Sequence, residues 1–361
     1  MNKISAKIIA DSKDNRGNRI TSYILTYPRI IHAEVMTHRM FSRNAASSRA
    51  IPFNKMVEMV QTDPFIPIAW QEDHKGMQGT KYITESHRVS FNKMMWIDSA
   101  NDAIKRSINL SENNITKQLC NRLLEPFLWY TCLVTATEYE NFFSLRCPKY
   151  HTLVSGEGFY HRSRKEVYEN HSNPINLEIL DNLTEEGWWM LSESGAEIHI
   201  QALAEAMWDA QNESTPKLLK DGEWHIPFGE KLNKKEIDKF AWITNKERNL
   251  SPTQTETAIA VARCARLSYM TFDKEIDFLK DVNLHDQLLE SGHMSPFEHV
   301  CRVMSDDEYF EFAKGRMLVK DGYGDGDSLE QDIDNDTEGW CNNIRGFIQY
   351  RYLIENKNTD V

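Results

Sequence analysis

The start of the chain carries the feature that most constrains its fold: two segments of alternating side chains on either side of a turn sequence. Residues 4–11 and 20–27 alternate imperfectly between apolar and polar side chains, and they flank Asn15-Arg16-Gly17-Asn18. Alternation over such lengths around a glycine-containing turn is typical of a β-hairpin. Pro28 closes the second segment, because proline has no N–H group to donate to a neighbouring strand.

Helical spacing of apolar residues dominates the rest of the sequence. Apolar side chains recur at helical spacing from Arg29 to about Phe41, and residues 202–208 are strong helix formers. Further helical patterns cover approximately residues 85–110, 115–145, 194–212, 256–270 and 274–291, whereas residues 61–84 predict a long loop. Long helices with a minority of strands predict an α+β fold, with helices packed on a small mixed or antiparallel sheet.

The composition limits the classes of function. The 361 residues have ordinary apolar (40%) and charged (27%) fractions and show no internal repeat, so we expect a single domain over 1–361 with a sizeable core. A net charge of −12 argues against a nucleic-acid polymer or an anionic membrane as partner. The start of the chain lacks the apolar core of a signal peptide and no apolar run could span a bilayer, so a cytoplasmic protein is expected.

The cysteines and the acidic run suggest no redox or metal chemistry. The six cysteines show no CxxC spacing and predict reduced, mostly buried thiols, none in the sequence context of a nucleophile. The acidic run at 321–338 lacks the glycine and glutamate that a calcium loop requires, so it predicts a solvated surface insertion. There is also no GxGxxG or GxxxxGK[ST] motif, so any nucleotide cofactor must be bound without those devices.

A basic segment between Thr37 and Arg49 contains arginines, a histidine and hydroxyl residues but no acidic side chain. Guanidinium groups bind phosphate through paired hydrogen bonds, and backbone N–H groups at a turn add further donors. His38, Arg39, Ser47 and Arg49 are therefore candidates for binding a nucleotide phosphate. A solvated basic turn with serine caps explains the same composition equally well.

A second polar segment, residues 292–299, reads Gly-His-Met-Ser-Pro-Phe-Glu-His. Its histidines do not have the i, i+4 spacing of a helical zinc pair and Pro296 stands between them, so no metal site is expected. A turn followed by a helix start fits better, with Ser295 and Glu298 offering hydrogen bonds to a polar ligand.

Arg122 and Arg146 stand in otherwise apolar stretches. A charge among apolar neighbours needs a partner. A bound anion or a uracil-like ring is one possible partner. An ion pair with Glu125 or Glu138 is the other, and the sequence alone slightly favours it.

Taken together, these segments resemble the signature regions of the flavin-dependent thymidylate synthases. The family's Arg-His-Arg triplet with its later serine and arginine corresponds to residues 37–49, and its Gly-His-x-[Ser/Thr]-Pro-Phe-Glu-His segment matches residues 292–299 fully. Shorter matches are Arg-x-x-Leu-Pro to residues 122–126, Asn-Phe-Leu-x-Leu-Arg to 141–146 and Ala-Arg-Val-Ser to 265–268. Two positions depart from the pattern, with Thr37 in place of the first arginine and Ala45 in place of a glutamate.

The matching segments stand in the reverse of the family's usual order, so the chain resembles a circularly permuted member. Permutation is tolerated when the original termini lie close together at the surface. It implies a half with the signature and nucleotide site in residues 1–235 and a half with Ser268 and Pro-Phe-Glu-His in residues 250–361. It also predicts that residues 345–352 lie beside the N-terminal strands.

The resemblance implies a homotetramer whose sites form between subunits and which converts dUMP to dTMP by FAD-dependent reductive methylation. Methylenetetrahydrofolate would donate the one-carbon unit and NADPH would be the reductant. By matching position, FAD would be held by His38, Arg39, Asn141, Ser268, Ser295 and Glu298, with His293 near the flavin and the folate. The nucleotide would be held by Ser47, Arg49, Arg122 and Arg146, and the catalytic roles would fall to Arg146, His293 and Ser47.

The departures at Thr37 and Ala45 keep two alternatives open, because both positions contact the substrate in the family. One is a related flavin enzyme that modifies C5 of another pyrimidine nucleotide or adds a different one-carbon group, for example by hydroxymethylation of dUMP. The other is a catalytically silent nucleotide-binding relative.

Overall fold

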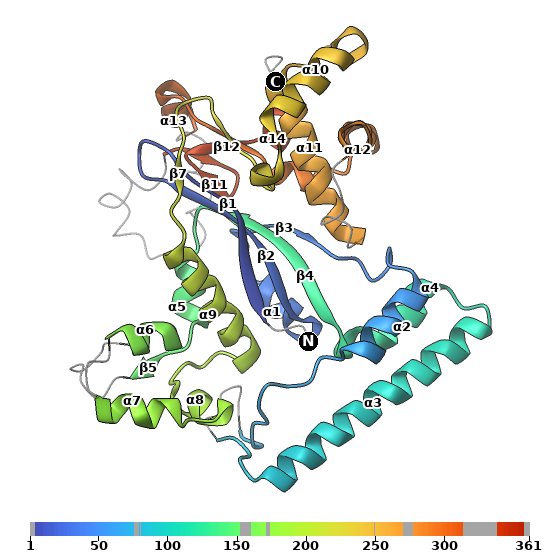
Figure 1. Cartoon of the computed structure of the whole chain (residues 1–361), viewed down its shortest axis with the longest axis vertical. Coiled ribbons are helices and arrows are strands. Elements are labelled where there is room, and N and C mark those ends of the chain that lie inside the picture. Colours follow the sequence, from blue (N-terminus) through green and yellow to red (C-terminus); the bar gives the residue numbers. More distant parts are fainter. Residues whose placement is uncertain are drawn as a thin grey trace, which may run out of the picture.

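The computed structural model of the chain describes residues 4–75, 79, 81–151, 160–170, 174–248, 250–269, 277–312 and 338–356. It has an α+β fold in which helices surround a small sheet (Figure 1), as the sequence predicts. Almost all of the acidic run at 321–338, including its expected place at the surface, lies outside the described residues. None of the helices among the described residues is long and apolar enough to cross a membrane.

The strands are β1 (Ser5–Lys13), β2 (Arg19–Pro28), β3 (Ser42–Ala45), β4 (Trp129–Ala136), β5 (Tyr150–His151), β6 (Tyr160–His161), β7 (Lys217–Leu218), β8 (Trp224–His225), β9 (Cys301–Val303), β10 (Trp340–Cys341), β11 (Ile344–Arg345) and β12 (Phe347–Gln349). The α-helices are α1 (His32–Met36), α2 (Phe53–Thr62), α3 (Ser86–Glu112), α4 (Lys117–Cys120), α5 (Glu140–Arg146), α6 (Arg164–Asn170), α7 (Pro174–Asp181), α8 (Glu185–Leu191), α9 (Ile198–Glu213), α10 (Lys234–Arg248), α11 (Pro252–Arg266), α12 (Phe278–Ser291), α13 (Asp306–Glu311) and α14 (Tyr350–Glu355). Short 3-10 helices are η1 (Arg29–Ile31), η2 (Asn121–Phe127), η3 (Gly229–Lys231), η4 (Leu267–Tyr269) and η5 (Ser295–Glu298).

The predicted N-terminal hairpin is confirmed and forms the middle of a five-stranded sheet with the order β3-β4-β2-β1-β7. The first four of these strands are antiparallel to their neighbours, whereas β7 runs parallel to β1. In the hairpin turn, Asp14 Oδ1 accepts hydrogen bonds from the backbone N–H groups of Arg16 (2.9 Å) and Asn18 (2.8 Å). Gly17 has φ of +92°, a conformation that glycine adopts without a steric cost.

The predicted helix at 115–145 is wrong in its central part. Helical structure ends at Phe127, next to Pro126, and β4 then runs through the middle of the sheet. Residues 131–136 are all buried, because Cys132 and Val134 face one core cluster while Leu133 faces another. A strand buried on both faces has no polar alternation, so its periodicity does not distinguish it from a buried helix.

The predicted helix at 29–41 is also too long. It ends at Met36, and the chain then enters β3, which pairs with β4 from Ser42 opposite Thr135 to Ala45 opposite Cys132. The basic segment therefore starts after the helix rather than on it. Most of its polar residues lie in or next to a strand that the sequence does not reveal.

Helices cover both faces of the sheet. On one face, α5 and α9 pack against β2 and β4 in a cluster that contains Leu25, Val134, Phe142 and Leu203. On the other face, the end of α11 contributes Cys264 to a second cluster with residues of β4 and of the turn before η3. The end of α11, with Ser268 just beyond it, therefore lies close to β4, the strand that pairs with β3 of the basic segment.

The predicted helix α3 is confirmed, and it runs along the outside of the molecule (Figure 1). The predicted loop at 61–84 begins directly after α2 and packs into the interior. Phe65 is fully buried and its carbonyl accepts a hydrogen bond from Trp96 Nε1 at 2.7 Å. The backbone N–H of Ile68 donates to His199 Nε2 at 3.1 Å. This part of the loop supports the core.

The C-terminal residues return to the N-terminal hairpin, as predicted for 345–352. A second sheet with the order β12-β9-β8 packs on the hairpin, and Phe347 shares a buried cluster with Ile20 of β2. The backbone N–H of Arg345 donates to Thr137 Oγ1 at 3.0 Å, just after β4. The residues after 299 therefore complete a core with the first strands, while the permutation itself stays a prediction.

A buried network of hydrogen-bonded polar side chains also connects segments that are far apart in the sequence. His225 lies between Ser12 and Ser22, at 2.9 Å from each hydroxyl, and Ser22 contacts Thr135 at 2.6 Å. Thr135 in turn contacts His299 Nδ1 at 2.8 Å. Burial lowers the pKa of both histidines to about 3, so they are neutral. The network fixes His299, the residue that follows Glu298, against the end of β4.

Candidate functional site

The side chain of His38 lies just beyond α1 and is buried. Its Nε2 accepts a hydrogen bond from Arg146 Nε at 3.1 Å, and its ring packs against Phe142 with the ring centres 4.8 Å apart. Burial, then the positive charges of Arg146 and Arg43, lower the pKa of His38 to about 4. His38 is therefore neutral near pH 7, which an acceptor at Nε2 requires. Two residues that were predicted separately, His38 for FAD and Arg146 for the nucleotide, are thus brought together at the end of α5.

The four residues of β3 divide between the two faces of the sheet. Asn44 Nδ2 donates to the carbonyl of Cys264 at 2.6 Å, and Ser42 accepts a hydrogen bond from Gln349 Nε2 at 3.0 Å. Both contacts go toward the C-terminal half of the chain. Since successive side chains of a strand point to opposite faces, Arg43 and Ala45 lie on the face next to α1.

Ser47 and Ser268 lie side by side, although they are far apart in the sequence. The backbone N–H of Ser47 donates to the carbonyl of Ser268 at 3.1 Å, and Ser268 Oγ lies 3.4 Å from Asn44 Oδ1. The contact joins the turn after β3 to the end of α11. It places one predicted nucleotide-binding residue next to one predicted FAD-binding residue.

The segment 292–299 is divided between the core and the surface. Pro296 and Phe297 are buried, and the Phe297 ring packs against Tyr350 with the ring centres 5.5 Å apart. His293 and Ser295 are exposed. Pro296 and Phe297 therefore anchor the turn, while His293 and Ser295 remain accessible to a ligand.

Glu298 is half-buried and paired with a cation. Its Oε1 accepts a hydrogen bond from Arg351 Nη1 at 2.6 Å. Gln349 Nε2 lies 3.4 Å from the Glu298 carbonyl and also donates to Ser42 Oγ. Gln349 thus bridges the segment that contains Glu298 to β3. This strand begins three residues after Arg39. Arg39 itself is exposed.

These contacts form a junction between the basic segment, the end of α5, Ser268 and the segment 292–299. Arg122 is not part of this junction. Its side chain is 51% exposed and its Nη1 donates to Glu125 Oε1 at 3.0 Å, which is the ion pair considered as the alternative in the sequence. Its neighbour Asn121 binds the carbonyls of Ser48 and Ile51, so η2 supports the loop around the exposed Arg49. Arg122 lies before the start of β4 and Arg146 after its end, and the strand itself spans on the order of 20 Å.

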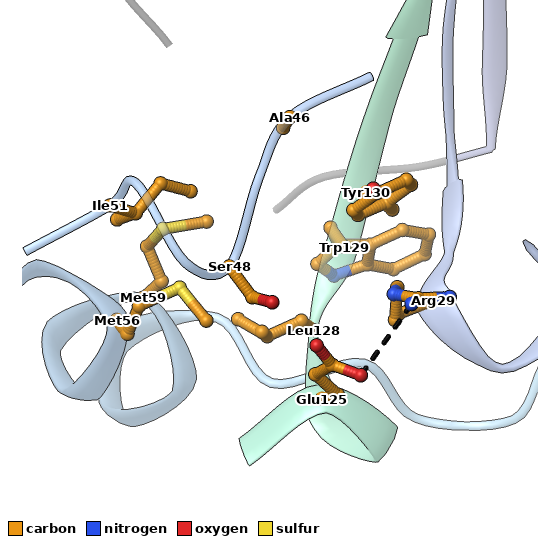
Figure 2. A pocket seen from close by; sticks show the side chains of 10 residues that line it. All are labelled: Arg29, Ala46, Ser48, Ile51, Met56, Met59, Glu125, Leu128, Trp129 and Tyr130. Carbon is orange, nitrogen blue, oxygen red and sulfur yellow. Dashed lines mark ion pairs between the residues drawn. The ribbon is translucent and has the colours of Figure 1, made fainter. Parts of the chain in front are cut away.

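A small pocket lies beside that loop, at the start of β4 (Figure 2). In Figure 2, Arg29, Trp129 and Tyr130 form one wall, and the side chains of Met56, Met59 and Ser48 lie opposite. Arg29 pairs with Glu125 at 3.5 Å. The Nε of Arg29 and the Nε1 of Trp129 are buried and have no hydrogen-bond partner among the described residues. The pocket has room for about one water molecule.

The junction brings together the segments of five predicted site residues. His38, Arg146, Ser47, Ser268 and Glu298 come from segments that contact one another directly or through Gln349. Asn141 is exposed at the start of α5, and Arg39, Arg49, His293 and Ser295 are exposed around the same segments. The residues that the sequence did not single out are Arg43, Gln349 and Arg351. Arg43 stands inside the basic segment, and recognition of β3 would have revealed its position.

Thiol and metal chemistry find no support in the described part of the chain. All six cysteines are free and buried, as predicted. Burial raises the pKa of Cys132 and of Cys341 to about 12, so these thiols are not ionised near pH 7. No cluster of three or more histidine, cysteine or acidic side chains suited to a metal ion occurs among the described residues.

The comparisons with known proteins give only distant structural similarities. No family model and no curated protein matches the sequence. A solved UMP/dUMP methylase PolB from Streptomyces cacaoi with 5-Br UMP is 14% identical, with a TM-score of 0.37, over 59% of this chain and 90% of that chain. The same protein with 5-Br dUMP gives 13% identity and a TM-score of 0.31 over 49% and 74%. Thymidylate Synthase X (ThyX) from Helicobacter pylori with FAD and dUMP gives 15% and 0.23 over 48% and 71%. Because identities and scores are low, we draw no functional conclusion from these similarities.

Proposed function

We propose that this chain is a FAD-dependent enzyme that acts on C5 of a pyrimidine mononucleotide, and that its reaction is the reductive methylation of dUMP to dTMP. Methylenetetrahydrofolate would be the one-carbon donor and NADPH the reductant. The observation that carries the proposal is that three of the resembling segments, 37–49, 265–268 and 292–299, meet directly or through Gln349. Ser47 meets Ser268, and Gln349 bridges Ser42 to the Glu298 carbonyl.

The charges at the junction fit an anionic, electron-rich ligand. Arg39, Arg43 and Arg146 have no carboxylate within ion-pair distance in the part of the chain that the structure describes. Guanidinium groups without carboxylate partners suit phosphate groups and ring carbonyls. Bound FAD would supply the reducing equivalents taken from NADPH. The residues that would hold it are His38, Arg39, Asn141, Ser268, Ser295 and Glu298, with His293 near the flavin and the folate.

The nucleotide would lie against Arg146, Ser47 and Arg49. Since Arg146 uses its Nε to bind His38, its terminal nitrogens remain for the ligand. Next to the pyrimidine, they would stabilise the negative charge of the enolate-like ring whose C5 attacks the one-carbon unit. Neutral His38 holds the guanidinium in place without adding a competing charge. Ser47 would orient the nucleotide, and Arg49 would bind its phosphate.

A single protomer does not bring all the nucleotide-binding residues to one place, because Arg49 and Arg122 lie near the start of β4 and Arg146 near its end. We propose that the site is completed between copies of the chain, in a homotetramer, with Arg49 and Arg122 bound to a nucleotide whose base lies against Arg146 of another protomer. A cytoplasmic location likewise stays part of the proposal.

The test is a reaction with the purified protein, FAD, NADPH, methylenetetrahydrofolate and dUMP, followed by mass spectrometry of the nucleotide. The expected product is dUMP plus one CH₂ unit, and it should not form without FAD or without the folate donor. If the protein binds flavin and dUMP but leaves the nucleotide unchanged with every donor supplied, the methylation proposal is wrong and the catalytically silent relative is favoured.

Hydroxymethylation of dUMP is the second candidate, and a specific observation favours it. Thr37 and Ala45 stand where the resembling family has an arginine and a glutamate, so the surroundings of the substrate differ. In the same experiment, this reaction would add one CH₂O unit instead of CH₂. The product mass therefore separates the two candidates directly.

A further inference from the structure

The side chain of Arg43 lies against the end of α1. Its Nη1 donates to the carbonyl of Met36 at 2.9 Å and to the carbonyl of His38 at 3.2 Å. These two carbonyls stand on either side of Thr37 in the chain. The guanidinium is therefore fixed next to Thr37, although Arg43 itself belongs to β3.

The surroundings of Arg43 are positively charged. Its charge and that of Arg146 both disfavour protonation of His38, so both guanidinium groups lie near that ring. The charge of Arg43 also disfavours protonation of His32, on α1. None of the carboxylates among the described residues forms an ion pair with Arg43 or Arg146. Two neighbouring guanidinium groups without a counter-charge favour an anionic ligand.

The position of β3 that could best provide a counter-charge for Arg43 has no carboxylate. Arg43 and Ala45 are two residues apart on one strand, so their side chains leave the same face of the sheet. A carboxylate at position 45 would reach Arg43, but the methyl group of Ala45 offers no acceptor. Thr37 and Ala45 are uncharged, so Arg43 supplies the positive charge next to Thr37 at the end of α1.

We propose that Arg43 is a ligand-binding residue of the site, whose guanidinium faces the anionic part of the bound pyrimidine nucleotide beside Thr37. The inference rests on the proposed function for the identity of the ligand. The anionic part is either the phosphate or the ring, which is enolate-like and electron-rich before its C5 attacks the one-carbon unit. A structural alternative is that Arg43 only satisfies the last carbonyl groups of α1, as basic residues at helix ends often do.

Calorimetric titration of the FAD-loaded full-length protein separates these roles. Arg43→Ala should weaken dUMP binding roughly 10- to 100-fold, the usual effect of losing a charged hydrogen bond. Arg43→Lys keeps the charge and should recover most of the affinity. Arg43→Gln keeps a donor for the carbonyl groups without the charge and should bind as poorly as Arg43→Ala. Arg106→Ala, on the exposed side of α3, is the control and should bind like the wild type.

Deoxyuridine and inorganic phosphate complete the design. A loss for dUMP and phosphate but not for deoxyuridine places Arg43 at the phosphate, and an equal loss for dUMP and deoxyuridine places it at the ring. Wild-type affinity for dUMP in Arg43→Ala, or full recovery in Arg43→Gln, overturns the inference and leaves the proposed function standing. If the wild type binds phosphate through Arg43 but does not bind dUMP, the proposed function fails and Arg43 stays an anion-binding residue. Binding of none of the three ligands overturns both.

Discussion

Two arginine-rich regions of this molecule differ in how their charges are balanced. Around α6, Arg162 pairs with Glu140 at 2.9 Å and Arg164 pairs with Glu185 at 2.9 Å. The backbone N–H of Arg164 also donates to Glu205 Oε1 at 2.6 Å. At the end of α1, by contrast, Arg43 and Arg146 bind only carbonyl groups and a neutral histidine among the described residues.

The difference teaches how to separate structure from function in a set of similar side chains. In the α6 network, which also contains Tyr150, Trp189 and Trp208, the guanidinium groups of Arg162 and Arg164 lie over indole rings at 4.6 Å and 4.7 Å. Cations with both a carboxylate and an aromatic face are fully used by the fold. The cations at the end of α1 retain donors for something that the chain does not supply. The predictions below test this contrast.

Removal of Arg146 should have the largest effect on binding. We expect Arg146→Ala to weaken dUMP binding on the order of 100-fold or more, because a charged partner of the ligand is lost and His38 is left without its donor. Flavin absorbance of the purified variant should stay close to that of the wild type. Titration with dUMP, followed by calorimetry, gives the first quantity and a visible spectrum gives the second.

A variant that retains dUMP affinity would show that Arg146 is not at the pyrimidine and would contradict the site assignment. A variant that loses both flavin and dUMP would instead indicate that Arg146 supports the junction as a whole. The thermal unfolding midpoint decides whether such a loss comes from misfolding.

Removal of Arg164 should have the opposite pattern. Arg164→Ala leaves Glu205 buried without its cation, and breaking such a pair costs about 2–3 kcal/mol of unfolding free energy when one partner is still partly solvated. Affinity for dUMP should stay within about twofold of the wild type, because the network lies outside the junction. Urea denaturation and the same titration measure the two effects. Equal losses in Arg146→Ala and Arg164→Ala would abolish the proposed distinction between the regions.

Part of this contrast could be predicted from the sequence. The basic segment and the matches at 141–146 and 292–299 pointed to His38, Arg146 and Glu298, and the structure brings their segments together. The α6 network could not be foreseen, because Arg164 finds Glu205 only after α9 has folded beside α6. β3 and β4 were missed for two other physical reasons. β4 is covered on both faces and lacks polar alternation, whereas β3 is a short edge strand, Ser-Arg-Asn-Ala, without an apolar alternation, so the position of Arg43 remained hidden.

The pH dependence of stability should reflect the α6 network. Burial, which outweighs the favourable charge of Arg164, raises the pKa of Glu205 from 4.5 to about 7. Because the folded state then holds the proton more tightly than the unfolded state, the stability from this group is present below pH ~4.5 and is lost as pH rises toward 7. The total change is about 3 kcal/mol, at about 1.36 kcal/mol for each pKa unit between 4.5 and about 7. Glu205→Gln should flatten the curve over this interval.

Urea denaturation of the wild type and Glu205→Gln at pH 5, 6, 7 and 8 would measure the effect. The matched control is Glu213→Gln, since Glu213 is exposed and pairs with Lys165 at the same surface. The control should follow the wild-type curve. Parallel curves for all three proteins would mean that Glu205 is already ionised in the folded state at pH 5.

At the end of α1, the smallest effect is expected, and it has the opposite sign. The pKa of His38 is lowered to about 4, so its contribution to stability is present above the ordinary histidine pKa of 6.5 and is lost as pH falls toward 4. Between pH 8 and pH 6.5, protonation of His38 should therefore change neither stability nor the geometry of Arg146.

We expect dUMP affinity of wild type and His38→Gln to vary in parallel over this range, within about twofold, since the amide oxygen of glutamine also accepts a hydrogen bond. A wild-type affinity that rises or falls around pH 6.5, and a flat profile for His38→Gln, would mean that His38 titrates normally. In that case the neutral clamp between His38 and Arg146 would not exist in solution, and the end of α1 would respond to pH as an ordinary exposed basic turn.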